Sequence, residues 1–212
     1  MRLAELSDRS GVSTATIKYY LREGVLPPGR RITATQAEYD EEHLRRLRLV
    51  RALVQIARVP VATVREVLAS VDDTSLNRTF RMGAALWALP GGPEPEDDDA
   101  LAAARREVDR LLERDGWAHA REIGELSPAH RALTGAVATL LRLGYPCDAD
   151  LLAPYARQVR QMAVQGLDDI EEFPTHLEQV EAAVAYTLLF EPVLLGLRRL
   201  ALEEETVERF GL

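Results

Sequence analysis

One short helix expected near the N-terminus would carry side chains suited to nucleic-acid contacts. Thr14, Lys18 and Arg22 recur at every fourth position, and Ala15 and Tyr19 lie beside them. In a helix these residues share one face, whereas the apolar residues between them point the other way. An α-helix fits the major groove of DNA, so these hydroxyls, methyl group and cations are usable contacts with base edges or phosphates. A solvated surface face is the alternative interpretation.

Two adjacent arginines, Arg30 and Arg31, follow a double proline just after this helix. The stretch RRITATQAEY is rich in threonine and loosely alternating, which favours a small hairpin over a helix. Cations on such a hairpin would contact DNA phosphates beside the predicted helix.

The first 71 residues predict four helices and this hairpin. Leu3 and Leu6 mark one side of the first helix, and Ser13 is placed to cap the second. The tight turn SGVS joins these two helices, which is typical of a helix-turn-helix. Asp40 is placed to cap a third helix with a long apolar stripe, and Pro60 begins a fourth.

The net charge of −8 is divided unevenly along the chain. Residues 1–71 hold twelve Arg and Lys against eight Asp and Glu, or +4, and residues 72–212 hold fourteen against twenty-six, or −12. DNA binding depends on local charge. The acidic total therefore does not exclude a DNA partner.

At these residues the sequence resembles the MerR family of transcriptional regulators. KYY at 18–20 and GVLP at 24–27 match the family's basic residue, two tyrosines and Gly-Leu-Leu-Pro-type exit. YDEEHLRRLRLVRAL and VPVATVREVL resemble the next two helices, so the similarity covers residues 3–68. It implies a winged helix-turn-helix protein that dimerises through a later helix and binds a pseudo-palindromic promoter operator. Such regulators distort the promoter for RNA polymerase, usually when an effector binds, although some repress.

The resemblance also implies which residues contact DNA. The Gly-Tyr-Arg run that usually precedes Tyr39 is TQA here, so contacts from the wing are expected to rest on Arg30, Arg31 and Gln36. Leu21 replaces a glutamate that often follows the two tyrosines, which suggests tighter packing. The full set of expected DNA-binding residues is Thr14, Ala15, Thr16, Lys18, Tyr19, Arg22, Arg30, Arg31 and Gln36.

Everything beyond residue 75 predicts helices, which gives a mainly α fold with one β hairpin. The acidic stretch at 89–99, rich in Pro and Gly, predicts an exposed linker. The expected division is a DNA-binding domain at 1–71, connecting and dimerisation helices at 72–117, and a helical effector or dimerisation domain at 118–212.

The dimerisation element is open between three segments. ALAAARREVDRLLERDGW carries leucine and valine at coiled-coil-like spacing, although over only about two and a half heptads. The helix SLNRTFRMGAALWAL and the long C-terminal helix are candidates to share the interface. A kink or break is expected in the C-terminal helix at Pro192.

A small organic effector bound between helices, or a protein partner, is expected to control the C-terminal domain. Cys147 is the single cysteine and the four histidines are scattered, so neither a metal site nor another cofactor is expected. Plain core packing is the alternative role for the aromatic residues that could line an effector pocket. These candidates are Trp87, Trp117, Tyr145, Tyr155, Tyr186 and Phe190.

Other functional classes find less support. The sequence has no Gly-rich phosphate loop and no recognisable Ser/His/Asp arrangement, so no enzymatic activity is expected. The N-terminus lacks the apolar segment of a signal peptide, and no run of about 18 apolar residues follows, so a cytoplasmic protein without a membrane partner is expected. A DNA-architectural or recombination-accessory protein with no small-molecule effector remains the alternative function.

Overall fold

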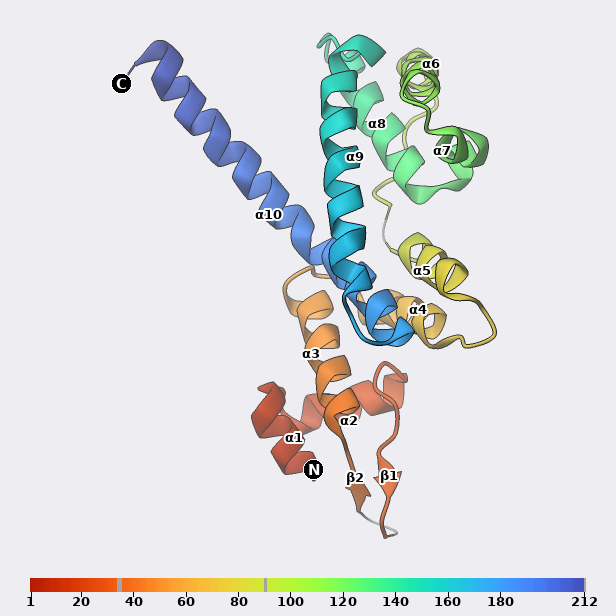
Figure 1. Cartoon of the computed structure of the whole chain (residues 1–212), viewed down its shortest axis with the longest axis vertical. Helices are drawn as coiled ribbons and strands as arrows, with labels where there is room; N and C mark the ends of the chain where they lie inside the picture. Colours follow the sequence, from red (N-terminus) through yellow and green to blue (C-terminus); the bar gives the residue numbers. More distant parts are fainter. Residues whose placement is uncertain (34–35, 90, 212) are drawn as a thin grey trace. The chain divides into compact units, whose positions relative to one another are not determined.

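The computed structural model describes residues 1–33, 36–89 and 91–211 (Figure 1). The chain forms two compact units. The first contains Met1–Ala88 and Phe173–Leu212, and the second contains Leu89–Glu172. The described residues are mainly α-helical with one two-stranded hairpin, which confirms the expected fold class.

The first two helices form the helix-turn-helix. Helix α1 spans Leu3–Ser10 and helix α2 spans Thr14–Glu23. Gly11 ends α1 in the left-handed conformation, with φ of 65°. This positive φ favours glycine, whereas the atom nearest to an added Cβ, Nη1 of Arg51 at 2.6 Å, is the end of a flexible side chain that can move.

The wing is the hairpin of strands β1 (Arg30–Arg31) and β2 (Ala37–Glu38), which pair antiparallel. The strands project away from the helices of the first unit (Figure 1). Ala34 and Thr35, which belong to the predicted hairpin, lie outside the described residues.

Two longer helices support the helix-turn-helix. Helix α3 spans Glu41–Gln55 and begins with a capping box. The Asp40 side chain accepts from the backbone N–H of His43, and the His43 ring accepts from the backbone N–H of Asp40. Helix α4 spans Val61–Asp72. Their shared core with α1 and α2 is apolar and fully buried. Its largest members are Leu6, Ile17, Leu26, Leu44, Leu47, Leu53 and Leu68.

Helix α5 (Arg78–Trp87) and helix α10 (His176–Phe210) complete the first unit, and α10 packs against α3, α4 and α5. The contact with α3 and α4 is centred on Arg46, which is only 6% exposed. Its Nε donates to Glu181 Oε1 at 2.7 Å, and its Nη1 and Nη2 donate to Asp72 at 3.0 and 2.5 Å. Arg45 also pairs with Glu181, at 3.2 Å.

These ion pairs explain why the compact units differ from the expected division of the chain. The expected C-terminal domain, 118–212, is split between the two units, because the first part of α10 packs with the helices α3, α4 and α5. The buried carboxylate of Glu181, 6% exposed, requires the arginines of α3 as partners. Helix α10 therefore belongs to the first unit, with α1 to α5.

The distal half of α10 has a different environment. The helix continues through Pro192 without the predicted break. From Glu203 to Phe210 every residue is exposed. Helix α10 is long and apolar enough to cross a membrane, and among the described residues it is the single helix that meets this criterion. Core helices of soluble proteins meet the same criterion, so it is weak evidence for a membrane span.

The second unit is a helical bundle. It contains α6 (Asp99–Arg114), α7 (Ala118–Ile123), a short 3-10 helix (Gly124–Leu126), α8 (Pro128–Arg142) and α9 (Ala149–Glu171). The expected linker 89–99 contributes no helix or strand from 91 to 98, and Pro90 lies outside the described residues.

The apolar face of α6 is used inside this bundle. Leu101, Val108, Leu111 and Leu112 are each at most 5% exposed and pack with residues of α8 and α9. The coiled-coil-like spacing was thus misleading about the partner, because a neighbouring helix of the same chain covers the stripe. Helix α6 offers no open apolar seam to a second chain.

We expect Arg46→Met to destabilise the protein by about 3 kcal/mol, because two carboxylates lose their buried partner. The measurement is urea unfolding followed by circular dichroism. Arg209→Met is the matched control, since the pair of Arg209 with Glu205 is largely exposed and is worth at most about 0.5 kcal/mol. Equal losses for the two variants would mean that the Arg46 contacts do not hold α10 in place.

Candidate nucleic-acid interface

Helix α2 has one buried and one exposed face. Ile17 and Tyr20 are 0% and 4% exposed and pack into the core. The opposite face is in solvent along its whole length. Its exposed members are Thr14, Ala15, Lys18, Tyr19 and Arg22, all of them predicted DNA-binding residues.

Caps at both ends fix the orientation of α2. The Ser13 hydroxyl accepts a hydrogen bond from the backbone N–H of Thr16 at 3.1 Å. The helix ends at Gly24 in the left-handed conformation, and the Tyr20 carbonyl accepts from the N–H groups of Val25 and Leu26 at 3.1 and 3.3 Å. The chain therefore leaves α2 in a fixed direction toward the wing.

Thr16 differs from the other predicted residues of α2. It is half-buried, and its hydroxyl lies 2.8 Å from the hydroxyl of Ser13. The structure thus places Thr16 in the cap of the helix, at the edge of the exposed face.

The two consecutive tyrosines have different environments. Tyr19 is 39% exposed, whereas burial raises the pKa of Tyr20. Their rings are tilted by 47° with centroids 5.8 Å apart. Tyr19 can therefore present its hydroxyl to a phosphate, and Tyr20 serves the core.

The three predicted wing residues are not equivalent. Arg30 forms an ion pair with Glu38 across the hairpin, and the hydrogen bond from Arg30 lowers the pKa of that carboxyl. The side-chain oxygen of Gln36 accepts from Nη1 of Arg2 at 2.7 Å. Arg31 is exposed and has no hydrogen bond or ion pair with any described residue. Among the described residues, therefore, no side chain competes with DNA for Arg31.

Sequence reasoning missed the N-terminal residues as parts of this site. The terminal ammonium of Met1 donates to the Tyr39 carbonyl at 2.6 Å, and the Tyr39 N–H donates to the Met1 carbonyl at 2.8 Å. A short N-terminal segment carries no periodicity, so no signal in the sequence indicated this pairing.

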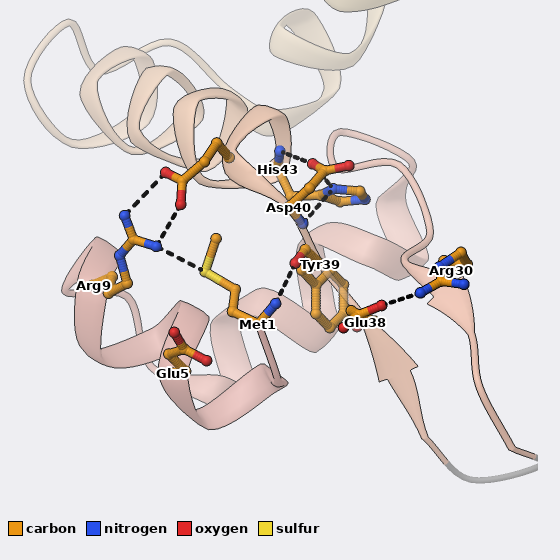
Figure 2. A pocket seen from close by; sticks show the side chains of 9 residues that line it. Met1, Glu5, Arg9, Arg30, Glu38, Tyr39, Asp40 and His43 are labelled. Carbon is orange, nitrogen blue, oxygen red and sulfur yellow. Dashed lines mark hydrogen bonds and ion pairs between the residues drawn. The ribbon is translucent and has the colours of Figure 1, made fainter.

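A hollow of about 440 Å³ lies between α1, the wing and the start of α3 (Figure 2). Its charged groups bond mostly to one another. Arg9 donates to both carboxylate oxygens of Glu41, at 2.5 and 3.0 Å, and His43 bonds to Asp40 at 2.6 Å. These contacts hold α1 and α3 together beside the wing.

Close packing also restricts where the wing can lie. A Cβ on Gly29 would lie 2.7 Å from the Glu38 carbonyl oxygen and 2.8 Å from the Tyr39 ring. Glycine is therefore required for the first strand to approach the second so closely.

The predicted effector-pocket aromatics are dispersed. Trp117 and Tyr155 line one cavity in the second unit. Tyr186 and Phe190 stack on α10 in the first unit, with centroids 5.8 Å apart. The other two, Trp87 and Tyr145, are 49% and 61% exposed.

The described residues include no group of three or more His, Cys, Asp or Glu that could hold a metal ion. Cys147 is buried, and burial raises the pKa of its thiol. Its thiolate fraction is accordingly lower than that of a free cysteine.

The fold and this site define a helix-turn-helix protein of the DNA-binding, transcription-regulating class. Residues 1–71 match the model of the MerR HTH family regulatory protein. One solved structure similar to this chain is that of SCO5550, a transcriptional regulator by its description, from Streptomyces coelicolor A3(2). The two sequences are 60% identical, and the match covers 100% of this chain and 99% of SCO5550, with a TM-score of 0.85. The chain belongs to the MerR family.

Two curated relatives are similar over about a quarter of this chain. One is the HTH-type transcriptional regulator ZntR homolog of Haemophilus influenzae, 36% identical over 50 residues, or 24% of this chain. The other is the HTH-type transcriptional regulator AdhR of Bacillus subtilis, 30% identical over 53 residues, or 25% of this chain. The chain spans only 37% and 38% of the lengths of these two relatives.

Proposed function

We propose that the protein is a cytoplasmic, homodimeric regulator that binds a pseudo-palindromic promoter operator and distorts it for RNA polymerase. A small organic effector or a protein partner controls it through the second unit, and it catalyses no reaction. The observation that carries this function is the exposed face of α2, where Lys18 and Arg22 have no ion pair with any described residue.

The exposed face of α2 supports specific DNA reading. Thr14 and Ala15 lie in its first turn, the part of a recognition helix that reaches base edges. Lys18 follows one turn later, and Arg22 and Tyr19 flank it for phosphate contacts. The opposite face of α2 packs into the core through Ile17 and Tyr20. The exposed residues can therefore contact DNA without any loss of core packing.

The apolar surface of the first unit supports a homodimer. Phe190, Val193, Leu197, Leu200 and Val207 recur on α10 at intervals of three, four or seven and are 44–58% exposed. Such a stripe is the pattern of a two-stranded coiled coil. On α5, Phe80 and Trp87 are also exposed, at 67% and 49%.

Charges on α10 favour an antiparallel pair. Arg198 and Arg199 precede a run of acids at 203–205. A parallel pair would place like charges side by side, whereas an antiparallel pair that crosses near residue 201 would bring the arginines of one helix near the glutamates of the other. We therefore place the dimer seam on the stripe that contains Leu197 and Leu200.

Footprinting on DNA upstream of the protein's own gene tests this function. We expect protection of one spaced palindrome, and Lys18→Ala to weaken operator binding by about 1–3 kcal/mol while relaxing specificity. Arg106→Ala is the control, because it removes an exposed cation from the second unit. Length-dependent coating with no preferred site would instead support a DNA-architectural protein.

The salt dependence of binding distinguishes the two wing arginines. We expect Arg31→Ala to lower the slope of log K against log salt by about 0.9 for each protomer, since each lost phosphate contact reduces counterion release. Arg30→Ala should lower it less, because Glu38 already neutralises that guanidinium. Glu38→Gln is the control that releases Arg30, and it should strengthen binding. Equal losses for both alanine variants would show that the Glu38 pair does not compete with DNA.

Sedimentation of the double variant Leu197→Glu/Leu200→Glu tests the dimer seam. We expect monomers, because four glutamates would be buried in the seam without partners. Leu195→Glu/Leu202→Glu is the matched control, since these leucines are 53% and 52% exposed on the opposite side of α10. A shift to monomer in the control alone would move the seam to that side.

A further inference from the structure

A cavity of about 240 Å³ lies within the second unit, between α6, α8 and α9. Leu111 and Leu112 of α6 line it, together with Leu133 of α8 and a row of apolar and aromatic residues of α9. Trp117, which follows α6, adds an aromatic wall. The surface of the cavity is almost entirely apolar. It therefore offers extensive contacts to an apolar molecule and almost no hydrogen-bond partner to a polar one.

The one charged residue among the described residues that line the cavity does not make it polar. This residue is Asp115, whose Oδ2 is buried and whose backbone carbonyl accepts from Nη1 of Arg160 at 3.0 Å. A charged ligand would lose its hydration in such a cavity without gaining a partner, which is unfavourable. A neutral apolar ligand has no such cost and gains free energy on leaving water. The chemistry of the walls therefore selects a neutral apolar ligand.

The cavity lies where two helices of the bundle are joined mainly through a third. Helix α6 packs against both α8 and α9, whereas α8 and α9 make few direct contacts with each other. Trp117 and Leu152 pack against two core clusters, one that α6 forms with α8 and one that it forms with α9. A molecule in the cavity would contact Leu133 of α8 and Val159 of α9 at once. It would thus supply packing contacts that these two helices do not make with each other.

We propose that this cavity binds a small neutral hydrophobic molecule with an aromatic ring. An apolar cavity of about 150 Å³ holds benzene, so the larger cavity of this protein has room for a ring with a short alkyl chain. The cavity is smaller than pockets for drug-sized molecules, which begin at about 300 Å³. Trp117 and Tyr155 provide ring surfaces against which an aromatic ligand packs.

This ligand class rests on the effector control proposed above and specifies its chemistry. Binding to the cavity is measurable without DNA. Loss of ligand binding in a protein that still protects its operator would refute the cavity and leave the DNA-binding function intact. The reverse result would refute the DNA-binding function alone.

Fluorescence of Trp117 in the full chain tests the ligand. The chain has two tryptophans, so Trp87→Phe leaves Trp117 as the single reporter. The probes are propylbenzene and the 2-phenylethylammonium ion, in which an ammonium group replaces the terminal methyl group. We expect saturable binding of propylbenzene. The ammonium ion should bind at least about tenfold more weakly, because its charged group would be desolvated without a partner.

Two substitutions of the same kind on α9 test the location of the site. Val159→Phe places a ring at a wall of the cavity and should weaken propylbenzene binding at least about tenfold, because the new side chain occupies the space of the ligand. Val164→Phe is the matched control, since Val164 is 55% exposed and lies outside the cavity. Val159 is itself 48% exposed, so both variants should fold, which circular dichroism verifies.

Four results would overturn the assignment. The absence of saturable propylbenzene binding to the folded Trp87→Phe protein would refute the site, and equal affinity for the ammonium ion would refute the ligand class. Unchanged propylbenzene binding in Val159→Phe would place the ligand elsewhere. Sedimentation that shows a dimer weakened by Val159→Phe, but not by Val164→Phe, would instead assign this surface to a contact between two copies of the chain.

Discussion

The guanidinium of Arg46 lies where three helices of the first unit meet. It bonds to Glu181 of α10 and to Asp72 at the end of α4, and it is itself part of α3. A buried carboxylate without this partner would be strongly unfavourable, so α10 can dock on the DNA-binding helices only in the register that brings Glu181 to Arg46. The packing of the first part of α10 depends on this constraint.

Stability and the proposed DNA contacts depend on different side chains in the same short segment. In α2, Ile17 and Tyr20 are buried while Lys18 and Tyr19 are exposed, so neighbouring residues serve opposite purposes. In the wing the separation is less complete, because Arg30 is engaged by Glu38. In the proposed function, the helix is consequently better suited to carry sequence specificity, and the wing to add affinity through Arg31.

The parts of the fold that depend on local chemistry were predictable from the sequence. Ser13 and Asp40 are caps whose bonds reach only three residues along the chain, and the helix-turn-helix follows from them and from apolar periodicity. Arg46 and Glu181 are 135 residues apart in the sequence, so no local sequence pattern predicts that they pair. Likewise, periodicity indicates that a face of α6 is apolar but not which helix covers it. The exposed face of α2 was predictable, whereas the engagement of Arg30 required the register of the hairpin.

The continuity of α10 links the buried ion pairs to the proposed dimer seam. Its first two turns are fixed to α3, and the helix then extends without interruption through Pro192 to Phe210. From Glu181 to Leu200 the axial rise is about 28 Å at 1.5 Å per residue. In the proposed homodimer, the position of the seam along α10 would therefore set the distance between the two α2 helices. Half-sites on DNA are read about one helical turn, roughly 34 Å, or a multiple of it apart. A register shift at the seam would change operator spacing without altering any residue that contacts DNA.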